Sequence, residues 1–143
     1  MALDTESFDI LLATVQRFVR ERLVPAENHL EEHDEVPPEL VEAMKDMGLF
    51  GLTVPEEFGG IGLSVSQEVQ VNFELGRTAP AFRSVFGTNI GIGSQGILMD
   101  GTPEQKNDYL PRVASGELVM SFALTKLGHP RGDLFNSFDR RLT

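Results

Sequence analysis

The chain has 143 residues, of which 41% are apolar, so it can form the core of one domain and has little room for a second. Its net charge of −10 argues against nucleic acid and anionic membrane surfaces as partners, because their phosphates would be repelled. There is no cysteine, which excludes disulfides and thiolate chemistry. With no signal-peptide pattern and no apolar run of membrane-spanning length, the sequence predicts a cytoplasmic protein.

The first predicted helix begins near Phe8 and ends at Pro25. Its apolar residues follow the i, i+3, i+4, i+7 spacing of a helix with one buried stripe: Phe8, Leu11, Leu12, Val15, Phe18, Val19 and Leu23. Proline lacks the amide hydrogen that a helix interior needs, so the helix is expected to stop at Pro25.

The acidic stretch 26–36 contains the run His29-Leu30-Glu31-Glu32-His33, which fits the H-x-x-E-H pattern of one class of zinc peptidases. That chemistry needs a long helix that holds both histidines on one face, and a third ligand elsewhere. The stretch is confined between Pro25 and the Pro37-Pro38 pair. We therefore interpret the histidines as solvated side chains among acids, with zinc hydrolysis as the alternative, and predict no metal site.

A second helix is predicted from Pro37-Pro38 to Met47, where Gly48 stops it. The next seventeen residues, 48–64, contain five glycines and a proline, which break regular structure. They are also too apolar for a solvated linker: Leu49, Phe50, Leu52, Val54, Phe58, Ile61 and Leu63. The sequence therefore predicts a packed loop that turns tightly and satisfies its own backbone groups.

A capping box at Ser64 and Gln67 starts a third helix, which carries Val65, Val69, Phe73 and Gly76 along one side. Pro80 begins a further helical stretch towards Asp100. Within it, the run 91–96 satisfies the G-x-G-x-x-G dinucleotide fingerprint, but no strand precedes it as that motif requires. Close helix packing is the favoured interpretation, and an unrelated NAD-binding protein is the alternative.

A further helix is predicted to run to about Ser115. Its start has a threonine cap at Thr102, a proline at the first helical position, Pro103, and a glutamine at the third, Gln105. Residues 118–125 then alternate with the period of a single strand, and a lone strand needs a partner. The last 18 residues, 126–143, lack periodicity and look disordered. Their charge is also different, because residues 1–125 carry 8 basic and 20 acidic side chains, whereas residues 126–143 carry 4 and 2.

Several runs together resemble the acyl-CoA dehydrogenase family between about Phe8 and Thr125. They are the Pro-Glu-Glu-Phe-Gly-Gly-Ile-Gly-Leu-Ser loop, the Thr-Pro-Glu-Gln-Lys helix with its Tyr-Leu-Pro, and the Ser-Phe-Ala-Leu-Thr strand. The resemblance implies a mainly α fold, a helical up-down N-terminal domain with one β-strand near 118–125. It divides the chain into a helical domain, 1–116, the first strand of a missing β-domain, 117–125, and a basic tail outside the family pattern, 126–143.

Enzymes of this family bind FAD and an acyl-CoA thioester where their three domains meet. A glutamate base removes the α-proton while the β-hydrogen passes to the flavin as hydride. By position, the resemblance places Phe122, Leu124 and Thr125 against the flavin. Ordinary strand burial is the alternative for Phe122 and Leu124. The resemblance places Val85, Thr88 and Ile92 along the acyl-chain channel, and plain helix packing would equally account for these three residues.

The resemblance stops after Thr125. The family continues with Glu-Pro and then Ala-Gly-Ser-Asp, whereas this chain reads Lys126-Leu127-Gly128-His129-Pro130. We expect such a break from a shifted reading frame or an early stop, and we expect no catalytic residue in the chain. The sequence thus predicts an N-terminal portion of a dehydrogenase that is inactive alone. The alternative is a non-catalytic interaction module that self-associates through exposed apolar surface.

Overall fold

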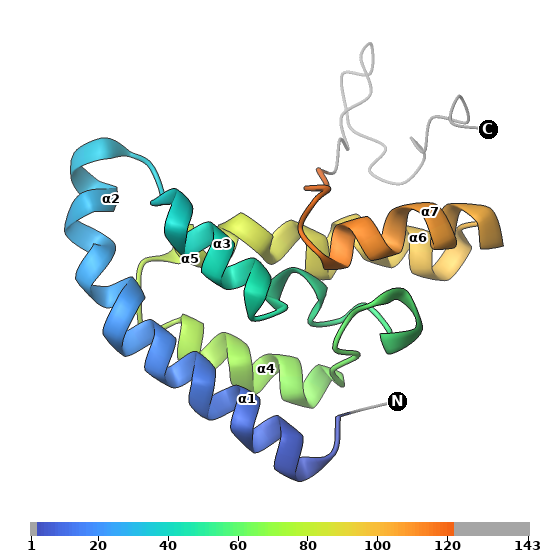
Figure 1. The fold of residues 1–143 in the computed structure, drawn as a ribbon, viewed down its shortest axis with the longest axis horizontal. Helices are drawn as coiled ribbons and strands as arrows, with labels where there is room; N and C mark the ends of the chain where they lie inside the picture. The colour runs from blue at the N-terminus through green and yellow to red at the C-terminus, as the bar shows by residue number, and fades with distance from the viewer. Residues whose placement is uncertain (1–2, 122–143) are drawn as a thin grey trace, which may run out of the picture.

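Residues 3–121 are described by a computed structural model, and seven α-helices account for most of these described residues (Figure 1). The helices are α1 (Thr5–Phe18), α2 (Glu27–His33), α3 (Pro38–Asp46), α4 (Val65–Leu75), α5 (Pro80–Thr88), α6 (Ser94–Asp100) and α7 (Pro103–Ala114). Two π-turns, η1 (Val19–Leu23) and η5 (Asn89–Gly93), and three 3-10 turns, η2 (Val24–Ala26), η3 (Leu49–Gly51) and η4 (Glu56–Phe58), join them. The prediction of a mainly α fold is confirmed.

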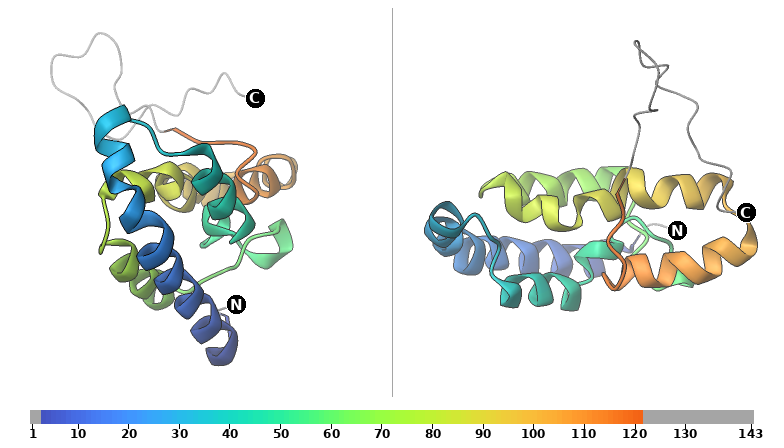
Figure 2. Two further views of the ribbon diagram at one scale, coloured as in Figure 1. Left: turned by 60° about the vertical axis from the view of Figure 1, so that its left-hand side comes forward. Right: turned by 90° about the horizontal axis from the view of Figure 1, so that it is seen from above.

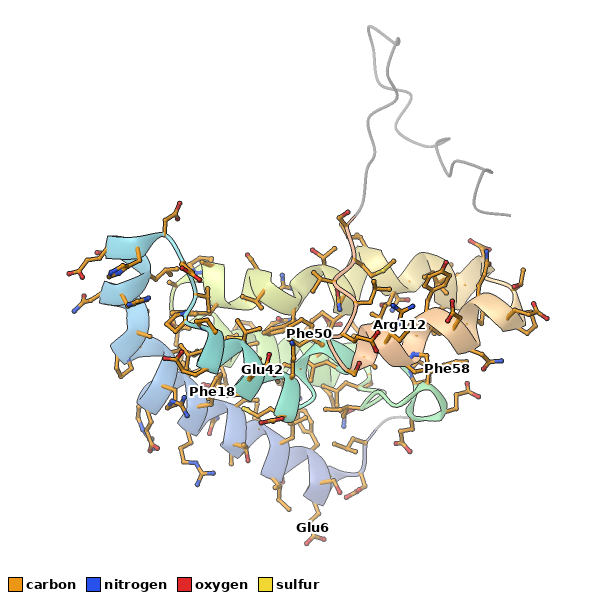
Figure 3. The ribbon with its side chains drawn as sticks, turned by 45° about the horizontal axis from the view of Figure 1, so that its top comes forward. Glu6, Phe18, Glu42, Phe50, Phe58 and Arg112 are labelled. Carbon is orange, nitrogen blue, oxygen red and sulfur yellow. The ribbon has the colours of Figure 1, made fainter. Side chains whose placement is uncertain are left out.

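Successive long helices run in alternating directions, which gives the predicted up-down arrangement (Figures 1 and 2). α4 packs against α1, and α7 packs back against α6. The main core lies among α1, α3, α4, α5 and the loop after α3. Phe50 is fully buried there with its ring centroid 6.0 Å from that of Phe86, whereas Glu6 points outward (Figure 3).

The first helix does not stop at Pro25, so that prediction is wrong. The π-turn η1 and the 3-10 turn η2 follow α1 directly, and α2 begins at Glu27. A proline inside a regular helix would clash with the carbonyl four residues earlier. Here the hydrogen-bond register changes in η1, the π-turn before it, and Pro25 lies in the first residues of η2, where its missing amide hydrogen is not needed.

The glycine-rich loop, residues 48–64, is packed as predicted. Its apolar side chains Leu49, Phe50, Leu52, Val54 and Leu63 are buried. The amides of Ile61, Gly62 and Leu63 donate to the carbonyls of Gly51, Val54 and Leu52 at 2.9, 2.9 and 2.8 Å. A methyl group at Gly60 would lie 2.0 Å from the Val54 carbonyl oxygen, so only glycine allows this close backbone approach.

The capping boxes at Ser64 and Thr102 form as predicted, but the side of α4 that carries Val65, Val69 and Phe73 is exposed. The exposed fractions of these three residues are 77%, 46% and 73%. Val71 and Leu75 supply the buried side instead. The helix has two apolar sides, and its packing against α1 decides which of them is buried.

The predicted strand is not present in residues 118–121, and the described part of the chain contains no strand. The alternating pattern finds no partner strand there, so its backbone cannot form a ladder. Residues 122–125 and the tail 126–143 lie outside the described residues. Within residues 3–121, none of the helices has the length and apolar character that crossing a bilayer requires.

Candidate functional site

The candidate site is built around η5, the π-turn between α5 and α6. Gly91 has φ −117° and ψ −116°, which interrupts the helical geometry at this point. The Thr53 hydroxyl of the glycine-rich loop donates to the carbonyl of Ile90, the residue before this interruption. Such π-turns recur at functional sites of helical proteins. The loop therefore holds the kinked helix in place.

Asn89 ties this kink to the segment that follows α7. The side chain is fully buried. Its Nδ2 donates to the carbonyls of Val113 and Leu118 at 3.0 and 2.8 Å, and its Oδ1 accepts from the Met120 amide at 2.8 Å. A buried amide group with all these partners fixes the positions of the backbones that it joins. Asn89 thus sets the path of residues 118–120.

Gly93 allows the same segment to approach the helix closely. A methyl group at this position would lie 2.5 Å from the Met120 Cβ and 2.7 Å from the Thr88 carbonyl oxygen. The run 91–96 lies in the π-turn and the first turn of α6, with a helix and not a strand before it. The dinucleotide fingerprint is therefore a chance match, because its phosphate cradle needs a strand that leads into a helix start.

The three predicted substrate-side residues lie on the helical run that contains the kink. Val85 is half-buried and packs against the main core, and Thr88 is half-buried at the end of α5. Ile92 lies in η5 with 60% of its surface exposed. The exposed neighbour Val119 lies in the segment that Asn89 anchors. Only Ile92 of the three presents a largely open apolar side chain.

The three predicted flavin-side residues, Phe122, Leu124 and Thr125, lie outside the described residues. In the described residues, Asn89 and Gly93 contact the chain as far as Met120, two residues before Phe122. The polar atoms of Asn89 are already used in this anchoring. The Asn89 side chain therefore has a structural role in the described residues.

Ser94, the first residue of α6, is fully buried beside Gly93. Its Oγ is the one buried side-chain polar atom of residues 3–121 that lacks a hydrogen-bond partner. A buried hydroxyl without a partner is destabilising.

Glu27 connects α2 to the beginning of α5. Its Oε1 accepts hydrogen bonds from the Thr78 hydroxyl at 2.7 Å and from the Ala79 amide at 3.0 Å. Ala79 is the N-cap residue of α5 and has no capping side chain of its own. A carboxylate here satisfies a free amide and complements the positive end of the helix dipole. Glu27 is therefore the cap of the helix that leads into the kink.

Two carboxyl groups among residues 3–121 have pKa values shifted downward, and both shifts come from helix capping. The side-chain and backbone hydrogen bonds of Ser7 lower the pKa of Asp4, the N-cap of α1. Hydrogen bonds to its own amide and to Thr102 lower the pKa of Glu104, in the first turn of α7. These shifts describe helix ends and identify no acid or base for catalysis.

The zinc-peptidase pattern does lie on a helix, α2, but the helix has only seven residues. No group of three or more metal-binding side chains occurs in the part of the chain that the structure describes. The set of protein ligands that zinc hydrolysis needs is therefore incomplete in residues 3–121.

Sequence reasoning missed Asn89, Thr53 and Glu27. One signal was available for Asn89, a single polar amide between the apolar residues Phe86 and Ile90 in a stretch predicted to be helical. Its partners, however, lie 24, 29 and 31 residues further along the chain. No spacing rule connects such distant groups.

Comparison with known proteins identifies the class of this helical domain. Residues 5–117 match the sequence model described as "Acyl-CoA dehydrogenase, N-terminal domain". The match covers the helices, the glycine-rich loop and the kink. The chain therefore belongs to the acyl-CoA dehydrogenase family, of which it contains the N-terminal domain.

Individual relatives agree with this assignment. The chain is 41% identical over 122 residues to a (2S)-methylsuccinyl-CoA dehydrogenase of Cereibacter sphaeroides, which covers 85% of this chain and 22% of the relative. It is 36% identical over 112 residues to an acyl-CoA dehydrogenase of Bacillus subtilis, with 78% of this chain and 30% of the relative covered. The chain thus spans less than a third of these relatives.

Solved structures show the same fold. An acyl-CoA dehydrogenase from Bacillus anthracis, in complex with FAD, superposes with a TM-score of 0.73 at 32% identity, over 88% of this chain and 22% of that one. A glutaryl-coenzyme A dehydrogenase in complex with glutaryl-CoA superposes with a TM-score of 0.75 at 27% identity, over 90% and 33%.

Proposed function

We propose that this chain is the N-terminal portion of a FAD-dependent dehydrogenase that removes two hydrogens across the α,β bond of an acyl-CoA thioester. The observation that carries the proposal is the match of residues 5–117 to the family's N-terminal domain. One relative was solved with FAD and another with an acyl-CoA, which supports this choice of cofactor and substrate class.

The residues of this chain bind and orient rather than react. Val85, Thr88 and Ile92 lie along one wall of the acyl-chain channel. Asn89 holds the backbone that leads to Phe122, Leu124 and Thr125, and these three residues contact the flavin, with Thr125 as hydrogen-bond donor. FAD, when bound, supplies the hydride acceptor for the reaction.

We further propose that the chain is inactive alone. The family's catalytic glutamate lies in the C-terminal bundle, and this chain spans 22% of the Cereibacter relative. Without a base, the α-proton of the thioester has no acceptor in position. With one wall only, bound substrate and flavin would remain in water, without the preorganised contacts that stabilise the transition state.

Anaerobic spectroscopy tests these statements. Incubating the chain with FAD and a series of acyl-CoA thioesters should leave the flavin absorbance unchanged. Replacing the matching region of the Bacillus subtilis relative with residues 5–117 of this chain should give a protein that binds FAD and is bleached by acyl-CoA. Bleaching by the chain alone would refute its inactivity, and a folded chimaera without FAD would refute the assignment.

The second candidate function is a non-catalytic module that self-associates. The observation that favours it is the exposed side of α4, where Val65, Val69 and Phe73 lie four residues apart. Exposed apolar side chains aligned on a helix favour association. Sedimentation velocity separates the two candidates, because a chain that stays monomeric at all concentrations contradicts the self-associating module. A Phe73→Ser variant should dissociate any oligomer that forms through this side of α4.

A further inference from the structure

Helix α2 brings its two histidines together on the surface of the molecule. His29 and His33 are four residues apart, so they occupy the same side of the helix. Their imidazole rings are stacked, with centroids 4.2 Å apart and planes inclined by 16°. Both residues are exposed. The acyl-CoA dehydrogenase assignment gives this pair no role.

A hydrogen bond prepares one of these rings for metal binding. The Nδ1 atom of His33 lies 3.1 Å from the carbonyl oxygen of His29. A carbonyl oxygen only accepts, so Nδ1 carries the hydrogen, and in the neutral ring the lone pair is on Nε2. Metal-binding histidines nearly always have this arrangement, in which the second ring nitrogen donates to a carbonyl or carboxylate.

The charge around the pair favours a cation. Residues 27–35 contain five acids, Glu27, Glu31, Glu32, Asp34 and Glu35, and no lysine or arginine. His33 is also the last residue of α2, next to the negative end of the helix dipole. The hydrogen bond at Nδ1 of His33 and the local charge therefore favour the same kind of ligand.

We propose that His29 and His33 bind one divalent transition-metal ion of the Zn²⁺, Ni²⁺ or Cu²⁺ class through their Nε2 atoms. Imidazole selects these metals over Mg²⁺ and Ca²⁺, which prefer oxygen ligands. With Zn–N bonds of about 2.0–2.1 Å, tetrahedral coordination places the two nitrogens roughly 3.4 Å apart. The stacked rings must turn about their side-chain bonds so that both in-plane Nε2 lone pairs face the ion, which their exposure on the surface allows. Water completes the coordination, because residues 3–121 offer no third protein ligand.

The bound ion would link two consecutive turns of a short helix. A seven-residue helix has little stability of its own, so a link between residues four apart stabilises it directly. Glu27, in the first turn of α2, caps α5, so the effect extends to the beginning of the helix that leads into the kink. Ion binding to the folded state therefore raises the melting temperature of the chain.

Calorimetric titration of the 143-residue chain with Ni²⁺ and Zn²⁺ at neutral pH tests the proposal. We expect one ion per chain, with His29→Ala and His33→Ala each weakening binding at least about tenfold. The third histidine, His129, provides a matched control, and His129→Ala should leave the affinity unchanged. Circular dichroism of the variants without metal checks that the substitutions leave the fold intact.

Competition and heating complete the test. Excess Mg²⁺ should not displace Zn²⁺, and Zn²⁺ should raise the Tm of the native chain but not that of the His29→Ala/His33→Ala double variant. Displacement by Mg²⁺, or full binding by the double variant, would show that the acids and not the imidazoles hold the ion. Loss of binding in His129→Ala would also overturn the proposal.

Discussion

Two regions of this molecule are attached to the core in very different ways. In the first region, buried side chains and hydrogen bonds from Thr53 and Asn89 join three segments: the glycine-rich loop, the kink at η5 and residues 118–120. Helix α2 is exposed along most of its length and is joined to the rest through Leu30, which packs on the core, and through Glu27.

This difference separates a rigid part from a lightly attached part. Free energies of local opening are highest where buried apolar contacts and buried hydrogen bonds are dense, and lowest where the backbone is exposed. The proposed acyl and flavin wall lies in the rigid part. The histidine pair lies in the lightly attached part, where a bound ion has most to stabilise.

The largest effect is expected at Gly60. Gly60→Ala places a methyl group against the Val54 carbonyl oxygen, a backbone atom that cannot move without the loop, and should lower the free energy of unfolding by more than about 3 kcal/mol. Gly59→Asn is the matched control, because a side chain there meets nothing and asparagine tolerates its φ of 81°. Urea unfolding measures both, and equal losses would contradict the close approach.

The second largest effect is expected at Asn89. Asn89→Ala leaves the carbonyls of Val113 and Leu118 and the amide of Met120 without their partner, and should cost about 2–4 kcal/mol of stability. Asn107→Ala, at an exposed position on α7, should change stability by under about 0.5 kcal/mol. Chemical denaturation compares the two. A similar small change in both variants would mean that residues 118–120 are not anchored.

A smaller effect is expected where α2 is attached. Glu27→Ala removes the cap of α5 and should cost about 1–2 kcal/mol. Glu27→Gln keeps an acceptor oxygen and should lose only part of this amount. Thermal unfolding of both variants measures the difference, and a cost as large as that of Asn89→Ala would remove the contrast between the two regions.

The smallest effect is expected at Ser94, and it has the opposite sign. Ser94→Ala removes a buried hydroxyl that has no partner, so stability should rise by up to about 1 kcal/mol. The exposed Ser66→Ala on α4 serves as the control and should be nearly neutral. A clear loss of stability at Ser94 would show that its hydroxyl is hydrogen-bonded in solution.

Local chemistry allowed much of this fold to be predicted. The capping boxes at Ser64 and Thr102 and the left-handed Gly48 depend on residues within one turn, so the sequence specifies them directly. The apolar stripe of α1 and η1, from Phe8 to Leu23, is similarly local. The packing of the glycine-rich loop followed from its apolar content.

Features that depend on distant groups could not be predicted. The continuation through Pro25 needs a π-turn, which no residue pattern signals. The buried side of α4 depends on how α1 packs against it, since both of its sides are apolar. The alternation after Gly116 resembles a strand, but residues 118–120 are held by the side chain of Asn89 instead of a neighbouring strand.

Native-state hydrogen exchange of the 143-residue chain tests the central claim most directly, namely that residues 118–120 belong to the rigid part. The Met120 amide, bound to Asn89, and the Leu63 amide of the loop should open only with free energies close to that of global unfolding. The Asp34 amide at the end of α2 should open at a far lower free energy. If Met120 exchanges as fast as Asp34, the kink does not fix this segment and the account of a preformed wall is wrong.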